Sequence, residues 1–240
     1  MSTRVTHTDD DEGRRERDVR NVCERIYGWS DDQATLVDDT TNALLSTADR
    51  CGVIALRGKG DLVPTAHTIH RRLVGADRPF VVCDPRRANR EASARSAANR
   101  KTSADALRVG AGGSVCIRLR RLPSDYHLLA PSRRMTDGTQ LFVCLSGDDR
   151  VVDMLCPPIR IPSLTQRSDL GRLVSECLAD ATRDLGVRSM RIPRQMHEAV
   201  LRHATMLADL EKVTLRIAAL KSAPNTTMAA AWLGMNPPVA

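Results

Sequence analysis

Short apolar runs alternate with segments of helical composition over the first two thirds of the chain. Five of these runs combine β-branched, aromatic or cysteine residues over three to five positions, which is typical of buried strands. They cover residues 53–56, 80–83, 115–117, 141–145 and 159–161. Because strands separated by helices usually pair in parallel and are covered on both faces, the pattern predicts an α/β core at about 31–162 with a doubly wound parallel sheet.

Beyond Pro162 the pattern is helical only. An apolar stripe with helical spacing runs from Leu170 to Leu185. Ser168 precedes this stripe as a candidate N-cap, and Gly186 follows it as a candidate C-cap in the left-handed conformation. The stripe therefore predicts an amphipathic helix that packs one face against the rest of the protein.

Two further helices are expected in the same part of the chain. Pro193 suits the first turn of one of them, and apolar residues at helical spacing predict another over 207–220. We therefore expect a small all-helical subdomain at 163–222, followed by a tail at 223–240.

The beginning of the chain has a different composition. Residues 1–18 mix acidic and basic side chains and contain almost nothing apolar. Such a segment cannot bury enough apolar surface to offset the entropy of ordering it. The sequence therefore predicts a largely disordered leader over 1–30.

Composition and charge narrow the class of protein. The chain has 240 residues, 42% of them hydrophobic, so it can bury a core. Its net charge is +7, but only four of its 36 basic residues are lysines, an arginine excess that often reflects GC-rich coding rather than a polyanionic partner. The arginine-rich segment 86–100 stays open as a nucleic-acid contact, with a solvated helix face as the favoured interpretation.

Membrane and metal chemistry are not expected. The polar N-terminus does not resemble a signal peptide, and no apolar run approaches the roughly 18 residues that a membrane span needs. The seven cysteines are odd in number and form no CxxC pair, as expected for free thiols in a reducing compartment. His67 and His70 have no acidic or cysteine partner at ligand spacing. We expect a cytoplasmic protein with no metal and no membrane partner.

Three stretches resemble one family. Pro158 to Leu170, PIRIPSLTQRSDL, is similar to the P-I-R-L-P-P-L-R-E-R-x-E-D-I segment of the sigma-54-dependent transcription activators, the AAA+ enhancer-binding proteins. Residues 53–82 resemble the family's Walker A region and second strand, and 112–117 resembles the G-G-T-L-F-L that leads into Walker B. The resemblance covers about 35–222 and implies an AAA+-like core followed by a helical lid.

The same alignment places non-matching residues on the family's Walker A motif. The family's G-E-S-G-T-G-K falls on 56–62, so that Leu62 stands where the phosphate-binding lysine belongs. A leucine cannot neutralise phosphates, and Asp61 adds a negative charge beside them. We therefore expect only a vestigial phosphate loop with residual nucleotide or phosphate binding at most, and no bound cofactor. This candidate loop consists of Arg57, Gly58, Lys59 and Gly60.

The other catalytic motifs are also replaced under this alignment. The Walker B Asp-Glu pair falls on Arg118 and Leu119, which removes the group that holds Mg²⁺ and the group that positions water. The sensor asparagine falls on Gly147, or on Ser146 if the register slips, and the sensor arginine of the lid falls on Ala208. The resemblance therefore implies no catalytic residues.

Two further differences concern the family's partners. The segment between Phe80 and Gly112 lacks the G-A-F-T-G-A loop with which the family contacts the sigma factor, and the tail resembles a truncated helix-turn-helix.

We predict a pseudo-ATPase, an interaction or regulatory module that binds a protein partner or a second copy through AAA+-type faces. Two alternatives stay open: an ATP-dependent sigma-54 regulator with a divergent nucleotide site, and a nucleic-acid-binding protein that uses 86–100.

Overall fold

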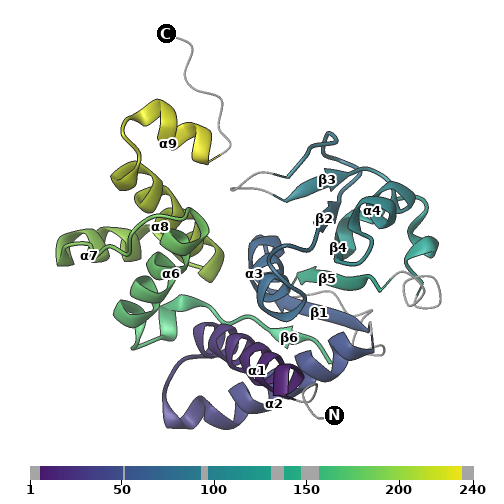
Figure 1. Cartoon of the computed structure of the whole chain (residues 1–240), viewed down its shortest axis with the longest axis horizontal. Helices are drawn as coiled ribbons and strands as arrows, with labels where there is room; N and C mark the ends of the chain where they lie inside the picture. Colours follow the sequence, from purple (N-terminus) through teal and green to yellow (C-terminus); the bar gives the residue numbers. More distant parts are fainter. Residues whose placement is uncertain (1–5, 51, 93–96, 131–137, 147–156, 234–240) are drawn as a thin grey trace.

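The computed structural model describes residues 6–50, 52–92, 97–130, 138–146 and 157–233 (Figure 1). The strands are β1 (Val53–Gly58), β2 (Phe80–Cys83), β3 (Ala98–Arg100), β4 (Ser114–Arg118), β5 (Gln140–Ser146) and β6 (Ile159–Arg160). The helices are α1 (Thr6–Tyr27), α2 (Asp31–Asp49), α3 (Val63–Leu73), α4 (Ser103–Gly110), α6 (Leu170–Asp184), α7 (Arg194–His203), α8 (Leu207–Ser222) and α9 (Thr226–Trp232). Short 3-10 helices occupy η1 (Leu119–Arg121), η2 (Tyr126–Leu129) and η3 (Leu164–Gln166).

The six strands form one parallel sheet in the order β3-β2-β4-β5-β1-β6. Alternate residues of the strands enter two separate apolar clusters, since successive side chains point to opposite faces. Ile54 of β1 packs in the cluster that contains Ile69 of α3, whereas Ala55 packs in the cluster that contains Ala106 of α4. The predicted α/β class with a doubly wound parallel sheet is therefore confirmed.

Strand β3 is an element that the hydrophobic pattern does not predict. Its three residues are all buried at the edge of the sheet beside β2. The side-chain nitrogen of Asn99 donates to the Ala88 carbonyl at 3.1 Å, and the Arg100 guanidinium donates to Glu91 at 2.6 Å. The described parts of 86–100 thus form a turn and this strand, so the interpretation of the segment as a solvated helix face is wrong.

One glycine near β4 is required by close packing. A Cβ at Gly113 would overlap the carbonyl of Pro79, whose oxygen accepts a hydrogen bond of 2.8 Å from the backbone N–H of Ser114. The Gly-Gly pair of the third resembling stretch therefore lets β4 start close to the segment that leads into β2.

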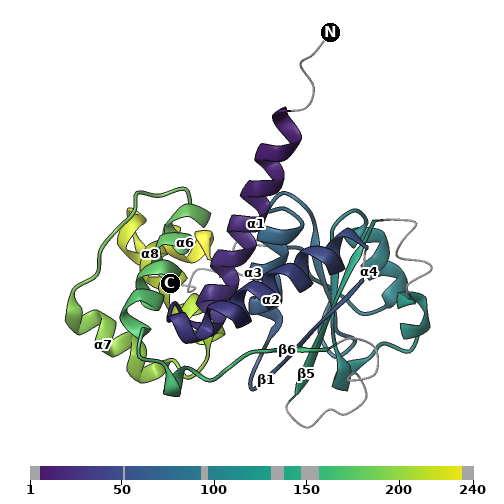
Figure 2. The same ribbon diagram turned by 90° about the horizontal axis from the view of Figure 1, so that it is seen from below.

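The N-terminal segment is helical where the sequence predicts disorder. Helix α1 covers Thr6–Tyr27, and its second half buries Val19, Val22, Cys23 and Ile26 in the main core. The prediction of a largely disordered leader over 1–30 is therefore wrong for this helix. Charged residues dominate the first half of α1, so the apolar stripe of its second half is not evident from composition. Helix α1 packs on α2 and α3 (Figure 2).

The segment after β6 is helical, as expected. Helix α6 has Asp169 rather than Ser168 at its N-cap. Gly186 adopts φ 64°, in the left-handed region, and its backbone N–H donates to the Arg183 carbonyl at 3.0 Å. Helices α6, α7 and α8 pack together beside the sheet (Figure 1).

The last described helix, α9, lies against α8. Ala229 and Leu233 are buried in a small cluster with Ala219 of α8. Residues 234–240, which include the end of the stretch that resembles a helix-turn-helix, lie outside the described residues.

No helix in the described part of the chain combines the length and apolar composition needed to cross a membrane.

Candidate functional site

The candidate phosphate loop lies at the carboxyl end of β1, directly before α3. Arg57 and Gly58 are the last residues of the strand, Lys59 is exposed, and Gly60 adopts φ 74°. A Cβ at Gly58 would lie 3.1 Å from the carbonyl oxygen of Ile161, tighter than ordinary contact. The glycines of this loop thus serve its turn and its packing against the segment after β6.

The start of α3 carries its own negative group. Oδ1 of Asp61 accepts a hydrogen bond of 3.2 Å from the backbone N–H of Val63. Backbone N–H groups at a helix N-terminus are the donors that phosphates use, because the helix dipole favours an anion there. Asp61 therefore occupies part of the position that a phosphate would take. Leu62, aligned with the family's lysine, is buried as the N-cap residue.

Asp61 is held in place by a cation from the sheet. The guanidinium of Arg118, at the end of β4, donates to Asp61 Oδ1 at 2.9 Å. The pKa of the Asp61 carboxyl lies below its ordinary value, because the charge and hydrogen bond of Arg118 outweigh the burial that opposes this shift. Asp61 is therefore ionised at neutral pH and paired.

A second carboxylate, that of Asp84, lies beside this pair and contacts three arginines. Asp84, the residue after β2, is completely buried. Arg118 donates to its Oδ2 at 3.0 Å and Arg121 of η1 at 3.2 Å, while Arg87 lies 3.5 Å away. Because a buried carboxylate is stable only when it is paired and hydrogen-bonded, Asp84 fixes the positions of these guanidinium groups.

A hollow of about 330 Å³ lies next to these ion pairs. It is lined by Gly60, Asp61, Leu62, Arg87, Arg118, Arg120, Arg121, Cys144, Leu145 and Ser146. Among the four residues of the candidate phosphate loop, all of them described, only Gly60 lines the hollow. The hollow therefore lies over the ends of β1, β4 and β5, where open parallel sheets place their ligands.

A second crevice, of about 200 Å³, lies where α3 and the edge of the sheet face α6 and α8. Thr68 of α3 donates to Oε1 of Glu211 of α8 at 3.0 Å across it. Burial raises the pKa of Glu211 to about 7, against the opposing effect of Arg25. The crevice thus contains a carboxyl group that titrates near neutral pH.

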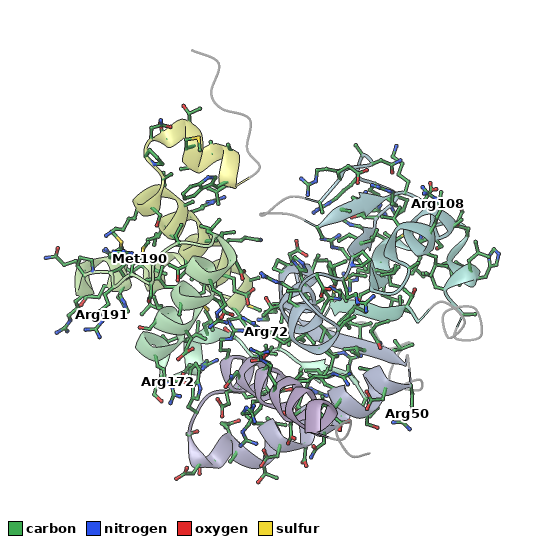
Figure 3. All side chains as sticks on the ribbon, in the orientation of Figure 1. Arg50, Arg72, Arg108, Arg172, Met190 and Arg191 are labelled. Carbon is green, nitrogen blue, oxygen red and sulfur yellow. The ribbon has the colours of Figure 1, made fainter. Side chains whose placement is uncertain are left out.

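Ion pairs join α1 and α3 to α6 along this crevice. Asp180 accepts from Arg25 of α1 and, at 3.0 Å, from Arg72 of α3, which Figure 3 labels between α3 and the helical subdomain. Asp184 accepts from Arg71 of α3. The core and the helical subdomain are therefore held together by charged groups from three helices.

His67 and His70 lie on α3, on the side of the crevice that belongs to the sheet domain. His70 is completely buried, with Nδ1 2.7 Å from Oγ of Ser114 and Nε2 3.0 Å from the Arg78 carbonyl oxygen. Since a carbonyl only accepts, Nε2 donates to it and Nδ1 accepts from the serine hydroxyl. Burial lowers the pKa of His70 to about 4 and that of His67 to about 3. Both are neutral packing residues at pH 7.

Sequence reasoning missed Asp84 and the crevice residues. Asp84 follows a predicted strand directly, and the rule that sites form at the carboxyl ends of parallel strands could have placed it beside Arg118. Thr68 and Glu211 are 143 positions apart, and no local pattern links them. Gly147, aligned with the sensor asparagine, lies outside the described residues, and Ser146 ends β5 at the rim of the hollow.

Within the described residues, no group of three or more His, Cys, Asp or Glu side chains is placed to hold a metal ion.

No protein-family model matches the sequence, and no curated protein matches it. Crystal structures of NtrX from Brucella abortus are similar to this chain. For the ADP complex the sequence identity is 16% and the TM-score 0.45, over 91% of this chain and 55% of that one. The ATP complex gives 17% and 0.40 over 76% and 49%, and a third NtrX structure gives 16% and 0.37 over 96% and 59%. The chain spans about half the length of these NtrX chains.

Proposed function

We propose that this chain is a catalytically inactive, AAA+-like module that acts by binding a protein partner or a second copy of itself. The observation that carries the proposal is the ion pair between Asp61 and Arg118. The chain's own carboxylate accepts from the N-terminus of α3, and an arginine holds it there. A nucleotide phosphate would have to displace that carboxylate and would meet its charge.

The residues that would perform hydrolysis support the same proposal. Leu62 is buried and carries no charge for the β- and γ-phosphates. Arg118 occupies the aligned position of the acidic residue that coordinates Mg²⁺, and a guanidinium repels that ion. Hydrolysis by this site would therefore lack both its metal and its phosphate-binding lysine.

The position of the helical subdomain adds a further argument. A Cβ at Gly60 would lie 3.7 Å from Cγ of Met206, the N-cap residue of α8, so the subdomain lies against the loop. The ion pairs of Asp180 and Asp184 hold it there by contacts within the chain. Nucleotide is therefore not needed to bring the two parts together.

An ATPase assay on the full chain tests the inactive site. With ATP and Mg²⁺ we expect no phosphate release above background, and the same result for Lys59→Ala. Turnover that Lys59→Ala abolishes would replace this proposal with the alternative, an ATP-dependent sigma-54 regulator with a divergent site.

Binding experiments test the second half of the proposal. Light scattering over a concentration series measures self-association, and capture from the native host's extract followed by mass spectrometry identifies a protein partner. We expect a defined oligomer or one specific partner. A chain that stays monomeric and captures nothing reproducibly would contradict the proposal.

The nucleic-acid alternative rests on the arginines of 86–100. Arg87 pairs with Asp84, and Arg100 pairs with Glu91 at 2.6 Å. These described arginines therefore support the turn and the edge strand, which does not favour binding by this segment. Tight oligonucleotide binding that weakens steeply with added salt would restore the alternative.

A further inference from the structure

Two cysteines meet on neighbouring central strands of the sheet. Cys116 of β4 and Cys144 of β5 have their Sγ atoms 3.6 Å apart. Both belong to the apolar cluster that contains Ile69 of α3, so their side chains share one face of the sheet. They are 28 positions apart in the sequence, and no CxxC-type spacing marks the pair. The fold therefore builds a dithiol that local sequence patterns do not show.

One sulfur of this dithiol borders open space. Cys144 lines the hollow of about 330 Å³ at the carboxyl ends of the strands and is 7% exposed. Cys116 is in contact with Cys144 and is itself 0% exposed. A small ion that enters the hollow therefore reaches Cys144 first and meets Cys116 behind it.

The geometry of the sheet opposes a disulfide between these cysteines. In the parallel register Cys116 lies opposite Phe142 and Cys144 opposite Arg118, so the two cysteines are offset by two residues. A disulfide would bring the sulfurs to about 2.0 Å, an approach of roughly 1.6 Å. Both strands are hydrogen-bonded to neighbours on both sides, which restricts such a movement. The pair is therefore better suited to hold an atom between its sulfurs than to bond directly.

A metal ion between the sulfurs requires a smaller change. A metal–thiolate bond is about 2.3 Å long, so two thiolates on one ion are at most about 4.6 Å apart. The observed 3.6 Å therefore has to increase by at most about 1 Å, which small side-chain rotations can supply. In the part of the chain that the structure describes, no third His, Cys, Asp or Glu joins the pair to form a larger ligand group. Two thiolates alone do not match zinc, which takes four ligands in structural sites, but they match a soft ion that accepts two.

We propose that Cys116 and Cys144 bind one soft monovalent cation of the copper(I) class between their sulfurs. Soft thiolate ligands select such ions, which accept two of them in a nearly linear arrangement. On binding, two S–H bonds break, two metal–sulfur bonds form, and both protons leave to solvent without a change in oxidation state. Because protons are released, the apparent affinity should rise with pH.

An anaerobic titration of the reduced full chain with copper(I), in competition with the chelator bicinchoninate, tests this site. We expect the chain to withdraw one equivalent of copper(I) from the chelator. Cys116→Ala and Cys144→Ala should each raise the Kd by more than about 100-fold, since changes around a metal ligand alone cost roughly 10–100-fold. Cys83→Ala is the matched control, because Cys83 of β2 is equally buried but lies in the apolar cluster on the other face of the sheet. It should keep the equivalent.

X-ray absorption at the copper edge of the loaded, unmodified protein does not depend on whether the variants fold. Two sulfur neighbours without nitrogen or oxygen support the site, and any other ligand set overturns it. No withdrawal of copper, retention in both Cys116→Ala and Cys144→Ala, or an equal loss in Cys83→Ala would also overturn it. The same holds if the equivalent is lost on replacing Cys51 or Cys156, which lie outside the described residues. The ATPase and self-association experiments are performed without copper, so the site and the inactive module are decided separately.

Discussion

The hydroxyl of Thr68 donates a hydrogen bond of 3.0 Å to Glu211, which joins α3 of the sheet domain to α8 of the helical subdomain. Glu211 also faces charged groups from two other helices, Arg25 of α1 and Asp180 and Asp184 of α6. Burial is the largest cause of its raised pKa of about 7, against an ordinary value of 4.5. We therefore expect the stability of the interface between the two parts of the molecule to depend on pH.

Replacing Glu211 by glutamine should stabilise the protein at alkaline pH. Between about pH 4.5 and pH 7 the folded state retains a proton that the unfolded state has released, so stability falls as pH rises through this window. Glu211→Gln removes that loss and keeps an acceptor for Thr68. We expect a gain of roughly 1–3 kcal/mol at pH 8 and little gain at pH 4.5, measured by urea unfolding.

Glu198→Gln provides the control for this substitution. Glu198 is exposed on α7 and pairs with Arg194 at 3.0 Å. An exposed pair of this kind contributes roughly 0–1 kcal/mol, so its variant should show no gain at pH 8. Equal unfolding profiles for Glu211→Gln and the unmodified protein at both pH values would mean that Glu211 is solvated and titrates normally.

Removing the charge of Asp61 should open the N-terminus of α3 to an external anion. In Asp61→Asn the amide no longer competes as an anion for the Val63 N–H, and Arg118 keeps its bond to Asp84 at 3.0 Å. We expect a loss of roughly 1–2 kcal/mol of stability without ligand. Inorganic phosphate should then raise the melting temperature of the variant more than that of the unmodified protein.

A uniform response to phosphate would contradict this account of Asp61. If phosphate stabilises both proteins equally, the Asp61 carboxylate does not block the helix N-terminus. Asp105→Asn, on α4 and remote from the loop, controls for the change in net charge.

The buried pair of His70 and Ser114 should make the protein sensitive to acid. The pKa of His70 is lowered from 6.5 to about 4, so the unfolded state takes up a proton that the folded state refuses. Stability should therefore fall as pH drops from about 6.5 to about 4. His70→Gln, which does not titrate, should cost roughly 1–3 kcal/mol at pH 7 but show a shallower loss over this range. Parallel slopes for the two proteins would show that His70 is not the group responsible.

Most of the sheet could be predicted from sequence because strand signals are local. Runs such as Phe80–Cys83 are continuous and apolar, as parallel strands buried on both faces must be. Strand β3 could not be found in this way, since the side-chain nitrogens of Asn99 and Arg100 find acceptors only through contacts that exist after folding. Helix α1 was missed because charged residues dominate its first half.

The candidate site was predicted in part. The alignment with the resembling family identified Arg118 and Leu62 as replacements of its catalytic residues. It could not show that Arg118 pairs with Asp61 and Asp84. That arrangement depends on which strands are neighbours: β4 lies between β2 and β5, and its end meets the turn after β2. The ionic contacts across the crevice depend on the docking of two subdomains, which local sequence patterns do not encode.

Helix α1 should be an integral part of the fold rather than a separable leader. Ile26 is 2% exposed and Arg25 pairs with Asp180 of α6, so the second half of α1 contributes both apolar burial and an ionic contact to the core. Ile26→Ala should cost roughly 2–4 kcal/mol in urea unfolding, because it leaves a cavity among packed side chains. Arg17→Ala, at an exposed position of the same helix, should change stability by less than about 0.5 kcal/mol.

Removing residues 1–27 should prevent cooperative unfolding or lower its midpoint severely, whereas removing residues 1–5 should not. A chain without residues 1–27 that unfolds like the full protein would show that α1 lies on the surface without supporting the core.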